Sequence, residues 1–106
     1  MSDSRLYLFA TIRPKPEFME DARAALDKLV PPTLKEPGCH IFSAFVSRTE
    51  LNTLHLFECF EDEQTLMLHY QQDYTKAVFA QYEEWLEKPV EVTKMLASSS
   101  VTAAQF

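Results

Sequence analysis

The chain has 106 residues, of which 46% are hydrophobic, including eight Phe, four Tyr and one Trp. This size fits one domain with a packed core and leaves no room for a second. The formal net charge is −6, and no cluster of Lys and Arg interleaves with aromatic residues, so nucleic acid is not an expected partner.

The two cysteines, Cys39 and Cys59, match neither a disulfide framework nor a metal motif, so we expect free thiols in a reducing compartment. The first residues are polar and carry no apolar run of the kind found in signal peptides. No stretch approaches the roughly 20 apolar residues that a membrane helix needs. The sequence therefore predicts a soluble cytoplasmic protein that does not contact a membrane.

The first predicted strand is "RLYLFATI" (5–12), which is rich in aromatic and branched residues. A helix follows from Pro16, because proline suits the first helical turn and the next apolar residues recur at helical spacing. Pro31 and Pro32 remove backbone donors inside this pattern. We therefore expect the helix to kink or break near Val30.

A hairpin of two strands is predicted over 39–48 and 53–60. Asp62 is then placed to cap a helix that begins at Glu63 and continues through Asp73.

A further helical segment is predicted over 75–88, and 89–96 is the last predicted strand. Residues 5–96 thus form the domain, and 97–106 form a tail that is either flexible or packed on a partner subunit. The order β-α-β-β-α-β predicts an α+β, ferredoxin-like fold, in which an antiparallel sheet carries its helices on one face.

Both faces of the predicted sheet carry apolar side chains. In the third strand, Glu58 and Phe60 share one face, whereas His55 and Phe57 point to the other. Two helices can cover only one face, and an uncovered face normally alternates with polar residues. We therefore expect a homodimer in which a second copy packs on the outer sheet face.

Four residues are candidates for chemistry. Glu58 is either a structural carboxylate with a polar partner or a general base, because a buried carboxylate is costly when unpaired. His69 is either a core histidine, bonded to a backbone carbonyl or to Glu58, or a group that transfers protons. Tyr70 and Tyr74 are either residues at the core edge or hydroxyl groups presented from an apolar wall.

Several common kinds of site are not expected. The single glycine, Gly38, rules out a Gly-rich phosphate loop, so a bound dinucleotide is not expected. His40 and His55 have no acidic or thiol partner at ligand spacing, so no metal site is expected either. Any chemistry would rely on a pocket and a few polar groups, without a cofactor.

Three segments resemble, in their order and spacing, the antibiotic biosynthesis monooxygenase domain family: "EPGC" (36–39), "LFECFEDEQTLMLH" (56–69) and "KPVEV" (88–92). The shared pattern is an aromatic-Glu-x-aromatic strand end, an acidic turn and a helix that carries a histidine, here His69. The resemblance covers roughly residues 5–96. It implies a dimeric α+β barrel with one pocket per subunit, between the sheet and its helices.

The family includes cofactor-independent monooxygenases that oxidise quinols and polycyclic aromatics. The resemblance therefore implies an enzyme that oxidises a quinol-like or enolisable aromatic molecule with molecular oxygen. His69 or Glu58 would take the proton, and Tyr74 would orient the substrate oxygen. The aromatic side chains that would hold the ring are Phe42, Phe60, Tyr70 and Phe79.

The chain departs from the family pattern at several positions. Phe60 replaces the common strand-end tryptophan, and Tyr74 replaces the usual second histidine. The first strand lacks the asparagine of the haem-degrading branch, and Phe79 occupies the position of that branch's histidine. Haem degradation is therefore not expected.

Two other functions stay open, namely a non-catalytic dimeric module that binds a small apolar ligand or a partner protein, and an isomerase of a small carbonyl compound. The isomerase would use the same acid–base residues without consuming oxygen. The enzyme hypothesis requires a cavity of roughly 300 Å³ or more. The residues expected to bound it are Glu58, Phe60, His69 and Tyr74.

Overall fold

The computed structural model describes residues 4–106 and confirms the predicted ferredoxin-like order, with the second helical region divided into two helices. The chain runs β-α-β-β-α-α-β, preceded at its first helix by a short 3-10 turn and followed by a short C-terminal helix. The elements are β1 (Leu6–Ile12), η1 (Pro16–Phe18), α1 (Met19–Leu34), β2 (Cys39–Val46), β3 (Leu54–Phe60), α2 (Glu63–Tyr70), α3 (Asp73–Trp85), β4 (Glu91–Met95) and α4 (Ser100–Ala103).

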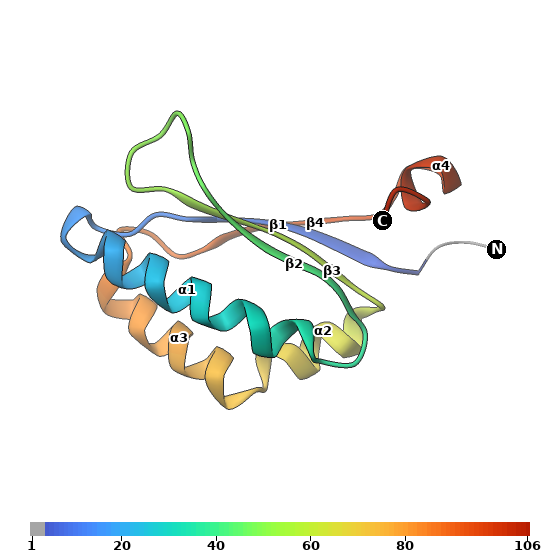
Figure 1. Cartoon of the computed structure of the whole chain (residues 1–106), viewed down its shortest axis with the longest axis horizontal. Coiled ribbons are helices and arrows are strands. Elements are labelled where there is room, and N and C mark those ends of the chain that lie inside the picture. The colour runs from blue at the N-terminus through green and yellow to red at the C-terminus, as the bar shows by residue number, and fades with distance from the viewer. Residues whose placement is uncertain (1–3) are drawn as a thin grey trace.

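The four strands form one antiparallel sheet in the order β2-β3-β1-β4. Helices α1, α2 and α3 all lie on one face of this sheet (Figure 1). The register places Glu58 of β3 between Leu8 of β1 and Phe42 of β2, so these three side chains share the helix-facing side. None of the helices within residues 4–106 is both long and apolar enough to span a bilayer.

The core lies between the helices and the inner face of the sheet. Leu8 and Phe60 are completely buried there, and Leu26 of α1 and Leu66 of α2 are 1% exposed. The alternation of Leu54, Leu56, Glu58 and Phe60 toward the helices is as the sequence predicts. A carboxylate therefore occupies one position of an otherwise apolar layer.

Helix α1 does not break at its prolines, where the sequence predicts a kink or a break. It continues for 16 residues through Pro31 and Pro32. The prolines remove the backbone bonds to the carbonyls of Asp27 and Lys28, but both residues are exposed, so water can satisfy these carbonyls. The fixed φ of proline is itself helical, and burial of Thr33 one residue later keeps the last turn on the core.

The predicted cap of α2 is present, but the helix ends earlier than expected. The side chain of Asp62 accepts a hydrogen bond from the backbone N–H of Thr65 at 2.8 Å, and the Thr65 hydroxyl accepts one from the N–H of Asp62 at 3.1 Å. Tight turns at Gln71 and Gln72 then end α2, and α3 begins at Asp73.

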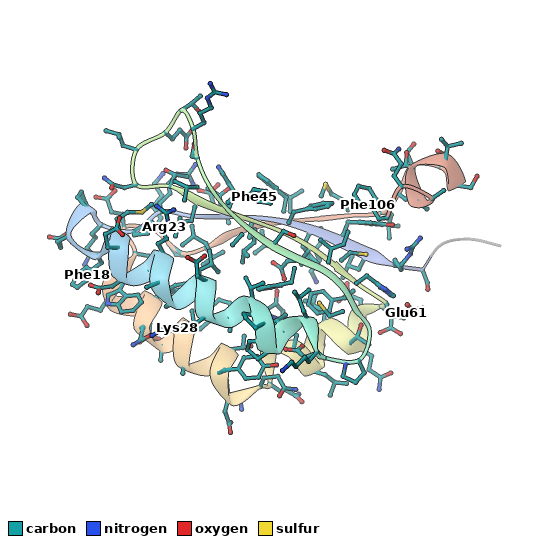
Figure 2. The ribbon with its side chains drawn as sticks, viewed as in Figure 1. Phe18, Arg23, Lys28, Phe45, Glu61 and Phe106 are labelled. Carbon is teal, nitrogen blue, oxygen red and sulfur yellow. The ribbon has the colours of Figure 1, made fainter. Side chains whose placement is uncertain are left out.

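The C-terminal tail folds back on the outer face of its own sheet. The Ser99 hydroxyl accepts a hydrogen bond from the N–H of Thr102 and caps α4. Beyond α4, the Phe106 ring packs on Tyr7 and Phe57, with centroids 5.7 Å and 5.5 Å apart. Figure 2 shows that Phe106 and Phe45 both lie on the side of the sheet away from the helices.

Candidate functional site

Glu58 is a buried carboxyl group with no polar partner in the described chain. Its side chain lies in the inner layer of the sheet and the residue is only 5% exposed. Across residues 4–106, neither a hydrogen bond nor an ion pair reaches its carboxyl group. Burial, helped by the nearby negative charge of Glu36, raises the pKa of Glu58 to about 7. The group can therefore gain or lose a proton near neutral pH.

His69 lines the same small cavity as Glu58 and is held by a carboxylate that the sequence analysis did not select. Both Glu36 oxygens lie 3.1 Å from Nδ1 of His69, and the two side chains are 9% and 3% exposed. A carboxylate can only accept, so Nδ1 carries a proton. In the neutral ring this fixes the tautomer and leaves Nε2 with its lone pair.

Tyr74 binds the same carboxylate from the start of α3. Its hydroxyl donates a hydrogen bond to Glu36, and the carbonyl of Pro32 lies 3.5 Å from it. Partial burial and the bond to Glu36 raise the pKa of Tyr74. Glu36 therefore connects the end of α1 to α2 through His69 and to α3 through Tyr74.

Three aromatic rings surround the imidazole of His69. The centroids of Phe60, Phe42 and Tyr70 lie 5.2, 5.4 and 5.6 Å from that of His69. Phe60 and Phe42 come from the sheet, and Tyr70 from the last residue of α2. With Glu36 on Nδ1 and rings around it, the imidazole has little freedom to rotate.

Two adjoining hollows lie on the side of the sheet that faces the helices. The inner one has a volume of about 30 Å³, and its lining includes Glu58, His69 and Thr75 among apolar side chains. The outer one is a groove of about 730 Å³, whose lining comes mainly from α3 and from the chain leading into β4. The residues that line both hollows are Tyr70, Phe79, Tyr82, Val90 and Val92.

The lining of the groove is largely apolar on the inside and charged at its edge. Leu86 adds to the apolar side chains that the two hollows share. Glu83, Glu87 and Lys88 are exposed and line the groove as well. A groove of this size lies within the range of small-molecule sites and suits an apolar ring.

The structure brings together five of the seven predicted site residues around these hollows. Glu58, His69, Phe42, Tyr70 and Phe79 line the inner cavity, and Tyr70 and Phe79 also line the groove.

The predicted cavity, bounded jointly by Glu58, Phe60, His69 and Tyr74, is not present. Phe60 is fully buried against the His69 ring and lines neither hollow, and Tyr74 turns away to Glu36. The break at residues 71–72 causes this difference, because it places Tyr74 on another helix than His69. The large volume lies instead in the groove beside β4.

Sequence reasoning missed Glu36, Thr75 and Tyr82. Glu36 is the first residue of the segment "EPGC" and stands just before a Pro-Gly turn. Such a turn brings the chain back over the sheet, so this position could have marked Glu36 as a candidate. Thr75 and Tyr82 carry no such signal, because their helical spacing is that of ordinary core residues.

The other two histidines belong to separate contacts. Nε2 of His40 lies 2.6 Å from Glu61 at the surface, and Nδ1 of His55 lies 3.2 Å from the Thr11 hydroxyl. In the part of the chain that the structure describes, no three His, Cys, Asp or Glu residues are grouped so that they could hold a metal ion.

Comparisons with known proteins agree with this architecture. The family model described as "Antibiotic biosynthesis monooxygenase" matches residues 5–81. An uncharacterized protein of Synechocystis, sll1783, is 28% identical over 91 residues, which are 86% of this chain; the chain spans only 62% of that protein's length.

Two solved structures are similar over nearly the whole chain. Rv0793 from Mycobacterium tuberculosis is 29% identical with a TM-score of 0.85, covering 91% of this chain and 97% of its own. A structure described as an antibiotic biosynthesis monooxygenase is 21% identical with a TM-score of 0.83, covering 89% of this chain and 99% of its own, and at that identity it supports the fold alone.

Proposed function

Since the chain belongs to the antibiotic biosynthesis monooxygenase family, we propose that it is a monooxygenase that oxidises a quinol-like or enolisable aromatic molecule without a cofactor. The observation that carries this proposal is that His69 and Glu58 line a small cavity that shares five lining residues with an apolar groove. The groove is large enough for fused aromatic rings, and His69 and Glu58 supply a base and an acid in the adjoining cavity.

The proposed reaction needs only a base, an apolar site and molecular oxygen. For a substrate with a CH₂ group beside an aromatic ketone, the base takes one C–H proton, and the resulting enolate transfers an electron to oxygen. A C–O bond then forms and gives a hydroperoxide. Loss of the second C–H proton and cleavage of the O–O bond release water, so that R₂CH₂ and O₂ become R₂C=O and H₂O.

His69 is the proposed base in this reaction. The Glu36 carboxylate keeps the proton on Nδ1, so Nε2 is the nitrogen that can accept one. Glu36 also stabilises the imidazolium that forms. Glu58, whose pKa is raised to about 7, is the proposed acid that returns a proton to the leaving oxygen.

The test is oxygen uptake with anthrone, an enolisable aromatic ketone, corrected for its spontaneous oxidation. We expect one oxygen molecule consumed per anthraquinone formed. His69→Ala should reduce the rate by roughly 10²-fold or more, as for loss of a general base. His40→Ala, which removes an exposed histidine that also pairs with a glutamate, is the matched control and should retain the rate. Equal rates for both variants, or isomerisation without oxygen uptake, would contradict the proposal.

We also propose that the protein is a homodimer that pairs through the outer sheet face. Phe9 and Phe45 are 41% and 54% exposed on that face, and Met95 of β4, which pairs with Tyr7, is 37% exposed on the same face. Covering this apolar surface favours association. Sedimentation velocity should give a dimer for the parent chain and a monomer for Phe9→Glu; a parent chain that sediments as a monomer would refute this interface.

The proposed location is the cytoplasm, a reducing compartment in which Cys39 and Cys59, which form no disulfide in the described chain, stay reduced.

A further inference from the structure

The inner cavity has an unusual set of polar groups around a very small volume. The Thr75 hydroxyl is buried and, within residues 4–106, has no hydrogen-bond partner. The residue is 1% exposed and lines the same cavity as Glu58 and His69. A buried hydroxyl that makes no hydrogen bond destabilises the folded chain, so its position calls for an explanation.

The two other polar groups at this cavity also have unused hydrogen-bonding capacity. The Glu58 carboxyl is unpaired in the described chain, as shown above. His69 uses only Nδ1, because that nitrogen binds Glu36. Three side chains from β3, α2 and α3 thus bring hydrogen-bonding groups to one place in an otherwise apolar core.

The volume of the cavity limits what it can hold. About 30 Å³ is the share of one water molecule in the liquid, so the cavity can take one oxygen atom but no ring. The adjoining groove can take the ring. Tyr70, Phe79 and Tyr82 line both hollows, so a ring in the groove can direct one substituent into the cavity.

We propose that this cavity binds the hydroxyl or carbonyl oxygen of an aromatic ligand whose ring lies in the groove, and that the Thr75 hydroxyl donates a hydrogen bond to that oxygen. Glu58 and His69 flank the same atom. The inference deepens the proposed function, since it names the part of the substrate that enters first. Its test measures binding and not turnover, so the two can fail separately.

The site therefore selects oxygenated aromatics over plain hydrocarbons of the same shape. An unoxygenated ring would leave Thr75 and Glu58 unpaired behind it, and a site built to hydrogen-bond an oxygen discriminates strongly against a ligand that lacks it.

The experiment compares 2-naphthol with naphthalene by isothermal titration under anaerobic conditions, using the full chain. The parent protein should bind 2-naphthol more tightly. Thr75→Val has nearly the same shape but no hydroxyl, and it should weaken 2-naphthol binding by roughly tenfold, the equivalent of one hydrogen bond, while naphthalene binding is unchanged. Thr75→Ser retains the hydroxyl and should keep the preference, which guards against a general loss of folding.

Thr33→Val is the matched control. Thr33 is completely buried like Thr75, but its hydroxyl donates to the Leu29 carbonyl at 2.7 Å and lines neither hollow. This variant should keep the preference for 2-naphthol. The proposal is overturned if Thr75→Val weakens both ligands equally or neither, or if the parent chain binds neither ligand.

Loss of the preference in Thr75→Val together with no oxygen uptake by the parent chain would support the oxygen site and refute the monooxygenase. Normal oxygen uptake by the parent chain, together with an unchanged preference for 2-naphthol in Thr75→Val, would support the monooxygenase and refute the oxygen site.

Discussion

The Glu36 carboxylate holds Nδ1 of His69 with both of its oxygens, each 3.1 Å away. The two residues are 33 positions apart, and the pair is almost fully buried. This contact decides which imidazole nitrogen can act as a base, because the nitrogen that faces the carboxylate keeps its proton. The chemistry that we propose for His69 therefore depends on a residue that lines neither hollow.

The first prediction concerns this positioning role of Glu36. Glu36→Gln keeps the shape but leaves one acceptor oxygen for two donors, His69 and Tyr74. We expect ¹⁵N spectra of the histidines to show His69 with a proton on Nδ1 in the parent chain and a mixture of tautomers in the variant. Oxygen uptake should fall about tenfold, which is less than the roughly 10²-fold or more expected for loss of the base itself.

The control for this variant is Glu61→Gln, which removes the charge from an exposed glutamate paired to His40. Its effect should be confined to the His40 signals and leave both the His69 tautomer and the rate unchanged. A single His69 tautomer that persists in Glu36→Gln would show that Glu36 does not set it.

The second prediction concerns Glu58 and the pH dependence of stability. Its pKa is about 7 in the folded chain, compared with an ordinary value of 4.5. Between these values the folded state holds a proton that the unfolded chain has released. The stabilising contribution of Glu58 is therefore complete below pH 4.5 and is lost as the pH rises through 7.

Urea denaturation of the parent chain and Glu58→Gln at several pH values measures this effect. The difference in unfolding free energy, parent minus variant, should fall by about 3 kcal/mol from pH 4 to pH 8. Glu84→Gln, the control, alters an exposed residue of α3, and its difference in unfolding free energy from the parent chain should be the same at every pH. Parallel curves for the parent chain and Glu58→Gln would show that the carboxyl titrates as it does in water.

The order of elements could be predicted from the sequence because local signals dominate there. The Asp62 cap, the alternation along β3 and the helical spacing of α1 each depend on residues close in sequence. Glu58 could be selected for the same reason, since a carboxylate in an alternating apolar strand stands out.

The contacts of the site could not be predicted in the same way. The partner of His69 depends on how the turn after α1 meets α2, and Glu36 is one of many glutamates in the chain. The direction of Tyr74 depends on a break of two residues between helices, which no proline or glycine marks. The continuity of α1 through Pro31 depends on tertiary burial, which outweighs the local preference.

The third prediction concerns Gly38, which follows Glu36 in the same turn. Its φ is +84°, and a Cβ placed there would lie 2.6 Å from Cγ2 of Thr65. Gly38→Ala combines a strained backbone with a clash against the cap of α2, so it should lower the unfolding free energy by about 2–4 kcal/mol. In a Thr65→Ser background, which keeps the capping hydroxyl but removes Cγ2, the loss should be smaller. An equal loss in both backgrounds would assign the whole cost to the backbone.

The last prediction concerns Tyr74, whose hydroxyl donates to Glu36. Hydrogen bonds to charged groups contribute about 1.5–3 kcal/mol, so Tyr74→Phe should lower the unfolding free energy by about 2 kcal/mol in urea denaturation. Tyr70→Phe is the matched control, because the Tyr70 hydroxyl makes no hydrogen bond within residues 4–106, so this variant should lose much less unfolding free energy. In a Glu36→Leu background the effect of Tyr74→Phe should nearly vanish, since the two residues act through one contact. If the losses of unfolding free energy in Tyr74→Phe and Glu36→Leu add in the double variant, Tyr74 stabilises the chain independently of Glu36. The carboxylate then does not connect α3 to the site.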